Sequence, residues 1–286
     1  MTAPLAPDRI AAAFFAACHT ELDALKPGNV HRHAAGHGME VAHFERAAAA
    51  AAAPIADPAI SVGQRILRAT EASVAATGLN TNLGIVLLCA PLAKAANETT
   101  LGIGLRRRLD MILSALDESD ARDAFAAIRL ANPAGLGKVE AGDVRDDTAP
   151  MTLIAAMRLA AERDRIANAY VTAYADIFDF ALPVLNDARS STSDPLLPVT
   201  TLHMALLAEF PDTHIIRKHG AAAAEAVRQE ARARHALWAP VASAKSIRAL
   251  VEFDTNLKSK GLNPGTTADF VVATLFAAAL IERKHS

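Results

Sequence analysis

The sequence predicts an all-α protein, and three observations support this prediction. Hydrophobic residues make up 52% of the 286 residues but aromatic residues only 5%, and alanine, which has the highest helix propensity, supplies much of the difference. Apolar residues recur at helical spacing along most of the chain. No segment shows the sustained alternation with β-branched residues that is typical of strands. We therefore predict a single-domain multi-helix array over residues 1–286, packed around a buried central helix.

Glycine and proline separate the helices of the first half of the chain. Asp8 follows a proline and is expected to be the N-cap of the first helix. The second helix is expected to end at Pro54, and Gly78 is expected to cap the C-terminus of the third. The fourth run is hydrophobic on all sides, so we expect it to be the central, buried helix. The four expected helices cover residues 8–25, 39–53, 58–76 and 85–96.

The second half of the chain continues the helical pattern. Residues 101–132 indicate two amphipathic helices that separate near 117–120. A long helical stretch over 151–189 is expected to break near Asp164 or Pro183. Residues 190–198 are rich in Ser, Thr, Asp and Pro, and we expect a surface loop there. Further helices are expected over 202–210, 221–235, 241–257 and 270–281.

Composition and charge exclude several classes of protein. A formal charge of −2 and a pI near 6.6 give no basic field for nucleic acid. Cys18 and Cys89 lack CxxC spacing and are expected to be buried, reduced residues. The N-terminus is a poor secretory signal, and the apolar run 47–53 is shorter than the ~20 residues that span a bilayer. We expect a cytoplasmic protein with no membrane partner, and the apolar run 271–280 offers a surface for a homodimer.

Five polar breaks interrupt the apolar helices, at 21–37, 78–84, 132–147, 211–220 and 256–269. Each carries Gly or Pro beside polar side chains. Glycine lets the backbone approach a ligand closely, and exposed backbone N–H groups can bind phosphate oxygens. The second break precedes the buried helix, and the N-terminus of a helix favours anions. The breaks are therefore the candidate functional segments.

Five cations in these breaks could hold a polyphosphate. They are Lys26, Arg32, Arg217, Lys218 and Lys258. Because the whole chain carries little net charge, any anion has to be held by such a local cluster. The alternative for each side chain is an ordinary solvated surface cation.

Glu21 lies near the C-terminus of the first predicted helix, on the same side as Phe14 and Cys18. A carboxylate at that end opposes the helix dipole. A bound partner therefore explains Glu21 better than helix stability does, and a salt bridge to a neighbouring cation is the alternative.

Three histidines, His31, His33 and His37, follow within the same break. They suit zinc binding, general acid–base catalysis or phosphate contact. No cysteine or HExxH helix accompanies them, and Lys26 and Arg32 would repel a metal ion. Acid–base or phosphate chemistry is therefore favoured over zinc.

An acidic patch over 138–147 is the better candidate for a metal. Asp143 lies three residues before Asp146 and four before Asp147, so these carboxylates converge if the segment is helical. Carboxylates next to a phosphate site suit Mg²⁺. An exposed acidic loop is the alternative.

Several of these segments, in this order, resemble motifs of the triphosphoribosyl-dephospho-CoA synthase family. Glu21 with KPGNVHRH, followed by residues 36–39, is similar to an acidic residue, a Lys-Pro-Gly turn and a Gly-Ala-His motif. Glu71 followed by residues 77–84 is similar to a second motif. Residues 263–269 are similar to a C-terminal Pro-Gly-Gly-Ser-Ala-Asp motif. The resemblance extends over most of the chain.

The resemblance implies an all-α transferase that uses ATP, Mg²⁺ and 3′-dephospho-CoA. It implies cleavage of the N-glycosidic bond of ATP, release of adenine, and transfer of the triphosphoribosyl unit to the ribose 2′-hydroxyl of the acceptor. Glu21 and Glu71 are the expected catalytic residues, and the three aspartates of the acidic patch would hold the metal. The expected substrate- and phosphate-binding residues are Lys26, Asn29, His31, Arg32, His33, His37, Asn80, Thr81, Asn82, Arg217, Lys218, Lys258, Asn263, Gly265, Thr266 and Thr267.

The chain departs from the family pattern at three places. Asn82 and Leu83 stand where relatives carry His-Lys, His31 stands where an aspartate is usual, and Thr266 replaces a glycine. These departures leave two alternatives. One is a related enzyme that acts on another phosphorylated cofactor precursor, for example in one-carbon cofactor biosynthesis. The other is a non-catalytic nucleotide-binding helical protein. The sequence contains no GxSxG motif, no Walker A motif and no GxGxxG motif after a strand. No motif of these other enzyme classes is therefore present.

Overall fold

The computed structural model describes residues 5–32, 34, 39–98, 103–132, 151–239 and 244–282. These residues form helices and no strand, apart from an isolated bridge between His31 and Ala34. The predicted all-α class is therefore confirmed. The chain divides into two compact units, which we describe separately, and a single continuous domain stays a prediction.

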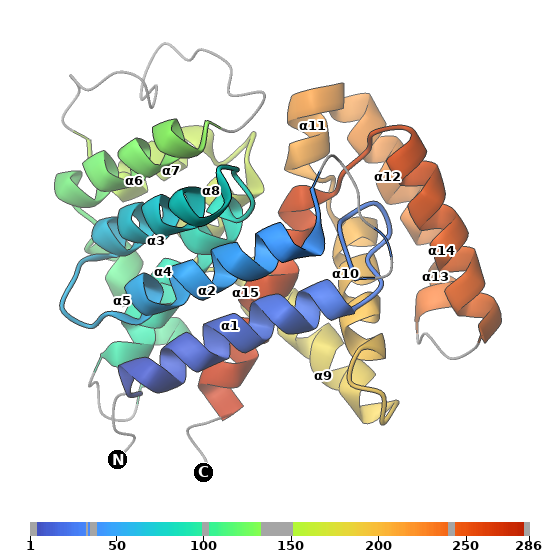
Figure 1. The fold of residues 1–286 in the computed structure, drawn as a ribbon, viewed down its shortest axis with the longest axis horizontal. Helices are drawn as coiled ribbons and strands as arrows, with labels where there is room; N and C mark the ends of the chain where they lie inside the picture. Colours follow the sequence, from blue (N-terminus) through green and yellow to red (C-terminus); the bar gives the residue numbers. More distant parts are fainter. Residues whose placement is uncertain are drawn as a thin grey trace. The chain divides into compact units, whose positions relative to one another are not determined.

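Unit 1 comprises Met1–Ala17, His43–Ala175 and Leu275–Ser286, and Figure 1 colours most of its helices blue to green. Three helices contribute residues to both units: α1 (Pro7–Asp23), α15 (Gly265–Glu282) and, by its first two residues, α2 (Val41–Ala56). The other helices of unit 1 are α3 (Val62–Thr77), α4 (Leu83–Asn97), α5 (Leu105–Ser114), α6 (Glu118–Ala131), α7 (Leu153–Ala160) and α8 (Arg165–Val171).

Helix α4 is the buried helix that the sequence predicts. Nearly all its side chains are buried, because it is apolar on every side. Pro91 lies inside α4 and has no N–H, so it leaves the carbonyl of Leu87 without its helical donor. The Tyr170 hydroxyl donates to that carbonyl at 2.7 Å. The tertiary structure thus supplies the hydrogen bond that the proline removes.

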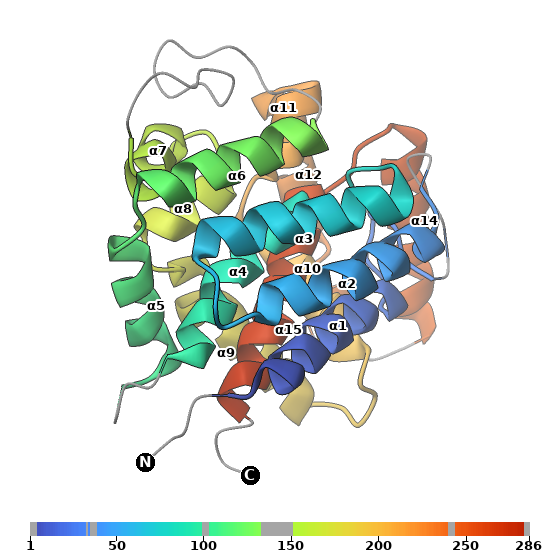
Figure 2. The same ribbon diagram turned by 60° about the vertical axis from the view of Figure 1, so that its left-hand side comes forward.

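Helices α3 and α6 run side by side in Figure 2. A Cβ on Gly63 would lie 2.5 Å from the Cα of Asp120, so only glycine permits this close approach. The Gly63 N–H donates to the Asp120 carboxylate at 2.7 Å. Both helices begin with a capping box, formed around Ser61 in α3 and Asp117 in α6.

Unit 2 comprises Cys18–Ala42 and Asp176–Thr274. Its helices include the π-helix η1 (Asp176–Ala181), α9 (Leu182–Ser190), α10 (Leu197–Glu209), α11 (Thr213–His219), α12 (Ala221–Ala233), α13 (His235–Trp238) and α14 (Ala244–Ser259). α10 is buried along almost its whole length. Its side chains form a core with Val227 of α12, Trp238 of α13 and Phe253 of α14, so α10 is the helix on which this unit is built.

Several boundaries differ from the sequence predictions. Pro54 lies within α2, which continues to Ala56, so the expected end at residue 53 is wrong. Over 151–189, Asp164 caps α8 and Pro183 lies in the first turn of α9, so both expected breaks are present. A further break follows α8, where Tyr174 adopts a φ of 58°.

Helix α15 is long and apolar enough, by length and composition, to cross a bilayer. However, 72% of it is buried inside the protein. The core helix of a globular protein can have the same length and composition. Cys18 and Cys89 are both buried and neither forms a disulfide, which agrees with the prediction of small buried hydrophobic residues.

Candidate functional site

The Lys-Pro-Gly turn after α1 contains a fully buried ion pair. Lys26 is 0% exposed and Glu21 is 4% exposed. The Lys26 ammonium contacts the Glu21 carboxylate and donates to Asn29 Oδ1 at 3.1 Å. The salt bridge to a neighbouring cation, which was the alternative explanation for Glu21, is therefore present. Glu21 and Asn29 are the partners of the Lys26 ammonium in this structure. The phosphate contact expected of Lys26 stays a prediction.

Gly28 brings the first and fifth polar breaks together. Its φ is +86°, and a Cβ there would lie 2.7 Å from Pro264 Cδ, so the conformation and the close packing both require glycine. Next to it, Asn29 Nδ2 donates to Asn263 Oδ1 at 2.8 Å. The Lys-Pro-Gly turn and the Asn-Pro-Gly turn are thus in direct contact, although they are far apart in the sequence.

Asp254 of α14 accepts hydrogen bonds from the same turn. The Gly28 N–H donates to its Oδ1 at 2.8 Å, and Lys258 Nζ donates to its Oδ2 at 3.0 Å. His31 Nε2 lies 3.3 Å from the same Oδ2 and 3.3 Å from Lys258 Nζ. Lys258 also donates to the carbonyl of Ala34 at 3.1 Å. We call Glu21, Lys26, Asn29, His31, Asp254, Lys258 and Asn263 the charged network.

Sequence reasoning missed Asp254. It lies within a predicted amphipathic helix and belongs to no glycine- or proline-containing break. The available signal was its position four residues before Lys258, which places both side chains on one face of the helix.

Burial changes the protonation equilibria of the charged network. It raises the pKa of Glu21 and lowers the pKa of Lys26, while the attraction between the two groups opposes both shifts. Burial also lowers the pKa of His31, against the opposing effect of Asp254. For Asp254, burial acts to raise the pKa, but hydrogen bonds from His31, Lys258 and the Gly28 N–H outweigh it and lower the pKa.

His203 lies beneath the Lys-Pro-Gly turn and is 0% exposed. Its Nε2 is 3.2 Å from the carbonyl of Pro27, an arrangement in which a neutral imidazole donates its N–H. Burial, together with the charge of Lys26, lowers the pKa of His203 to about 3. No local pattern marks His203 as a site residue, because it lies inside the continuous apolar helix α10.

Asp212 joins the fourth break to the fifth. Its Oδ1 caps α11 by accepting from the N–H groups of His214 and Ile215 at 2.9 and 3.0 Å. Its Oδ2 accepts from the N–H and the hydroxyl of Thr267 at 2.7 and 2.8 Å. Thr213 and Thr266 share a further hydrogen bond of 3.1 Å between their hydroxyls. Three of the five breaks therefore meet within unit 2. Gly265 packs against the His214 ring.

The remaining cations of unit 2 lie outside this network. Arg32 forms an ion pair with Asp23, and both side chains are substantially exposed. Arg217 and Lys218 occupy the last turn of α11, where positive charge is favoured by the helix dipole. Their expected phosphate contacts stay predictions.

The second motif lies in unit 1. Glu71 is exposed on α3, and Asn80 is exposed just before α4. Asn82 is buried and donates to Ser73 Oγ at 3.0 Å, while the Leu83 N–H lies 3.4 Å from Asn80 Oδ1. Thr81 is buried, and its hydroxyl finds no hydrogen-bond partner in the part of the chain that the structure describes.

The metal prediction and two histidines cannot be placed. Asp143, Asp146, Asp147, His33 and His37 lie outside the described residues. Within those residues, no group of three or more His, Cys, Asp or Glu side chains is arranged to hold a metal ion.

This arrangement offers a buried carboxyl group with a raised pKa, an adjacent ammonium, and two glycine turns held against each other. A raised pKa makes such a carboxyl group better suited to accept a proton. The amides of Asn29 and Asn263 orient the two turns. The chemistry that it supports is proton transfer at a polar ligand.

Comparison with known proteins agrees with the motifs. The family model described as CitG: ATP:dephospho-CoA triphosphoribosyl transferase matches residues 7–286. The 2-(5″-triphosphoribosyl)-3′-dephosphocoenzyme-A synthase of Klebsiella pneumoniae is 32% identical over 100 residues, which are 35% of this chain and 32% of that protein. The match thus spans about a third of that curated relative.

A solved structure shares the fold. The crystal structure of an Archaeoglobus fulgidus protein, a candidate triphosphoribosyl-dephospho-CoA synthase, matches with a TM-score of 0.64 at 24% identity and covers 82% of this chain and 97% of that one. The family model extends over nearly all of the chain, with the motif-bearing turns inside it. The predicted family is therefore confirmed: the chain belongs to the CitG family.

Proposed function

We propose that this protein transfers the triphosphoribosyl unit of ATP to the ribose 2′-hydroxyl of 3′-dephospho-CoA and releases adenine, in the cytoplasm. One observation carries the proposal: the Lys-Pro-Gly and Asn-Pro-Gly turns, both family motifs, pack together around the buried pair of Glu21 and Lys26. Family membership supplies the reaction class, and the charged network supplies groups suited to it.

The reaction exchanges one bond at C1′ of the ATP ribose. The oxygen of the acceptor 2′-hydroxyl forms the new bond to C1′, and the C1′–N9 bond breaks with its electron pair leaving on adenine. Positive charge develops at C1′ in the transition state, and a carboxylate close to it is stabilising. The hydroxyl proton passes to a carboxylate base and then, directly or through solvent, to the departing adenine.

Glu21 is our choice for the base. Burial raises its pKa, and a carboxylate with a higher pKa is a stronger base for a hydroxyl proton. The Lys26 ammonium contacts the carboxylate and would orient it. Glu71, the second expected catalytic residue, is exposed in unit 1 and has no comparable environment, so it remains the second choice.

ATP is expected to enter as its magnesium complex, with the ion carried by the phosphate oxygens. Asp143, Asp146 and Asp147 stay candidates to complete its coordination. The polyphosphate itself would contact the cations around the glycine turns.

The decisive experiment incubates the full chain with ATP, Mg²⁺ and dephospho-CoA and follows adenine release and the mass of the acceptor. We expect free adenine and an acceptor heavier by one triphosphoribosyl unit. Glu21→Gln should lower kcat by roughly 10²- to 10⁴-fold, the usual contribution of a general base. Formation of ADP or AMP without adenine would overturn the proposal. A matched control, Glu118→Gln on the exposed start of α6, should leave kcat unchanged.

A further inference from the structure

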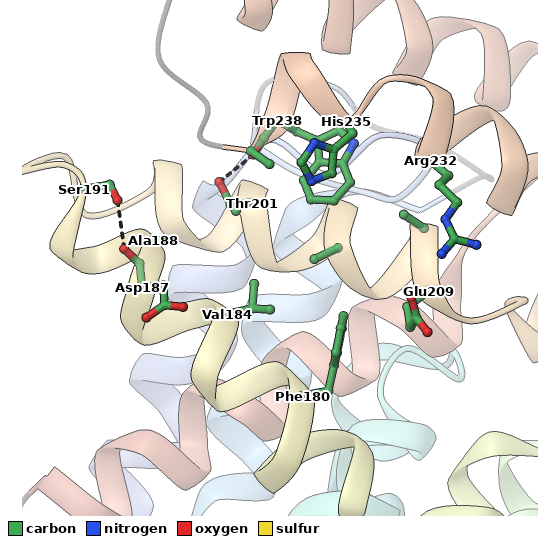
Figure 3. A pocket seen from close by; sticks show the side chains of 13 residues that line it. Phe180, Val184, Asp187, Ala188, Ser191, Thr201, Glu209, Arg232, His235 and Trp238 are labelled. Carbon is green, nitrogen blue, oxygen red and sulfur yellow. Dashed lines mark hydrogen bonds between the residues drawn. The ribbon is translucent and has the colours of Figure 1, made fainter.

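A second concave site lies in unit 2, between η1, α9, α10, α12 and α13. It is a half-open pocket of about 460 Å³, which falls within the range of small-molecule sites. Figure 3 shows Phe180 entering the space from one side and His235 and Trp238 from the opposite side. Ala188, Ala205 and Ala208 also line it.

The pocket is separate from the charged network. Thr201, Ala205 and Ala208 of α10 line it, and their spacing places them on one face of the helix. His203, two residues after Thr201, points the other way and contacts the carbonyl of Pro27. The two sites therefore occupy opposite faces of α10, and a ligand in the pocket does not touch Glu21 or Lys26.

The walls of the pocket suit a flat aromatic ring. Only 5% of the chain is aromatic, yet Phe180 and Trp238 both line this space, together with the ring of His235. Phe180 is held edge-on by Phe210, with ring centroids 5.5 Å apart. Trp238 is held by a hydrogen bond from its indole N–H to the Ala231 carbonyl at 2.9 Å. The His235 ring packs against Trp238 at 4.7 Å between centroids, and these aromatic walls with small alanine side chains suit a planar ligand.

The rim of the pocket supplies one cation and one anion. Arg232 and Glu209 are both exposed lining residues, and Figure 3 shows their charged ends on the same side of the opening. In the described part of the chain, no hydrogen bond or ion pair engages either side-chain charge. A carboxylate accepts from an amino group, and a guanidinium donates to a ring nitrogen. An acyl chain would use neither group.

From these walls and this rim, we propose that the pocket binds the ring of an aminopurine. The base would stack against Phe180 and Trp238, donate its exocyclic amine to Glu209, and accept from Arg232 at a ring nitrogen. This binding site is additional to the proposed transfer site and does not depend on the transfer reaction.

The pocket contains its own reporter, because Trp238 is the only tryptophan in the chain. Tryptophan fluorescence of the full chain, excited at its red edge, should change saturably as adenine is added. Hypoxanthine, which has a carbonyl in place of the amine, should bind more weakly. Adenosine and ATP distinguish whether the free base or the base of a nucleotide is bound. Binding of either supports the proposal.

Variants test the two halves of the site. Loss of one stacking ring in Phe180→Leu should weaken adenine binding about tenfold. Glu209→Gln should reduce the preference for adenine over hypoxanthine. Arg232→Ala should weaken adenine binding, and because Arg232 lies on the exposed rim, this variant tests the site even if the Phe180 variant fails to fold. Arg122→Ala, an exposed arginine of unit 1, is the matched control and should change nothing.

Two results would overturn the inference. One is the absence of a saturable signal with adenine up to its solubility limit, checked by equilibrium dialysis. The other is unchanged affinity in both Phe180→Leu and Arg232→Ala. Glu21→Gln should bind adenine here as tightly as the unchanged protein, so failure of the transfer proposal and failure of this one are distinguishable.

Discussion

The two polar breaks that carry the first and second family motifs are built in different ways. Around residues 26–31 of unit 2, the charges of Glu21, Lys26 and Asp254 are buried and each contacts an opposite charge. Around residues 77–84 of unit 1, the buried polar groups are neutral, and the nearby carboxylate of Glu71 is exposed. The first motif should therefore be needed for folding as well as for function, whereas the second should be nearly dispensable for stability.

The largest expected effect is on the buried ion pair. Lys26→Met leaves the Glu21 carboxylate buried without its cation and should lower the free energy of unfolding by about 3–5 kcal/mol. Urea denaturation measures this. The double variant Glu21→Leu/Lys26→Met should recover most of the loss, because it removes both charges. Lys218→Met, at an exposed lysine, is the control and should stay within ~0.5 kcal/mol. A single variant as stable as the parent would contradict the comparison.

Asp254→Asn should have the next largest effect. It removes the negative charge that faces Lys258 and His31, and we expect a loss of about 2–3 kcal/mol, in the range of hydrogen bonds to charged groups. The folded pKa of Asp254 is depressed, so its stabilising effect is present above the unfolded value of 3.8 and is lost as the pH falls through the folded pKa. The difference between variant and parent should therefore shrink when unfolding is measured at strongly acidic pH. If the stability difference between variant and parent stays the same at acidic pH, the negative charge of Asp254 is not its cause.

His203 gives unit 2 a pH dependence of its own. Its pKa is about 3 in the folded protein against 6.5 when unfolded, so the unfolded state binds the extra proton first as the pH falls. From pH 7 to pH 5, this linkage should cost about 2 kcal/mol of stability. His203→Gln can still donate to the Pro27 carbonyl, and its urea-unfolding free energy should fall by about 2 kcal/mol less over that interval. Equal pH slopes for variant and parent would show that His203 is not buried in its neutral form.

The smallest effects should come from matched threonines in the two units. Thr213→Val removes the hydrogen bond to Thr266 and should cost about 1 kcal/mol. Thr81→Val, in the second motif, replaces a buried hydroxyl that has no partner among the described residues, and should change stability by less than ~0.5 kcal/mol or raise it slightly. Thermal unfolding of both variants tests the pair. A larger loss for Thr81→Val would mean that the second motif is also built around buried polar contacts.

Much of the fold could be predicted because its causes are local. The all-round hydrophobicity of α4 predicts its burial. Gly78 adopts the left-handed conformation of a C-cap, with a φ of 69°. Asp164 is the N-cap of α8, at one of the two breaks that the sequence predicts. A tertiary contact also supplies one hydrogen bond that the local sequence removes. Pro91 is tolerated inside α4 because Tyr170 donates to the carbonyl that the proline leaves open. No local pattern connects those two residues.

By itself, the sequence determined the helical class, the family, and the turns that carry Glu21, Lys26 and Asn263, because composition, periodicity and glycine-containing turns act over a few residues. Only the tertiary structure decided that Lys26 is buried against Glu21, that Asp254 joins the charged network while His203 contacts the Pro27 carbonyl, and that a separate aromatic pocket lies on the opposite face of α10. Burial and the resulting pKa shifts depend on groups brought together from distant parts of the chain. Desolvation and pairing of charges are properties of that packing, and a linear pattern of residues does not contain them.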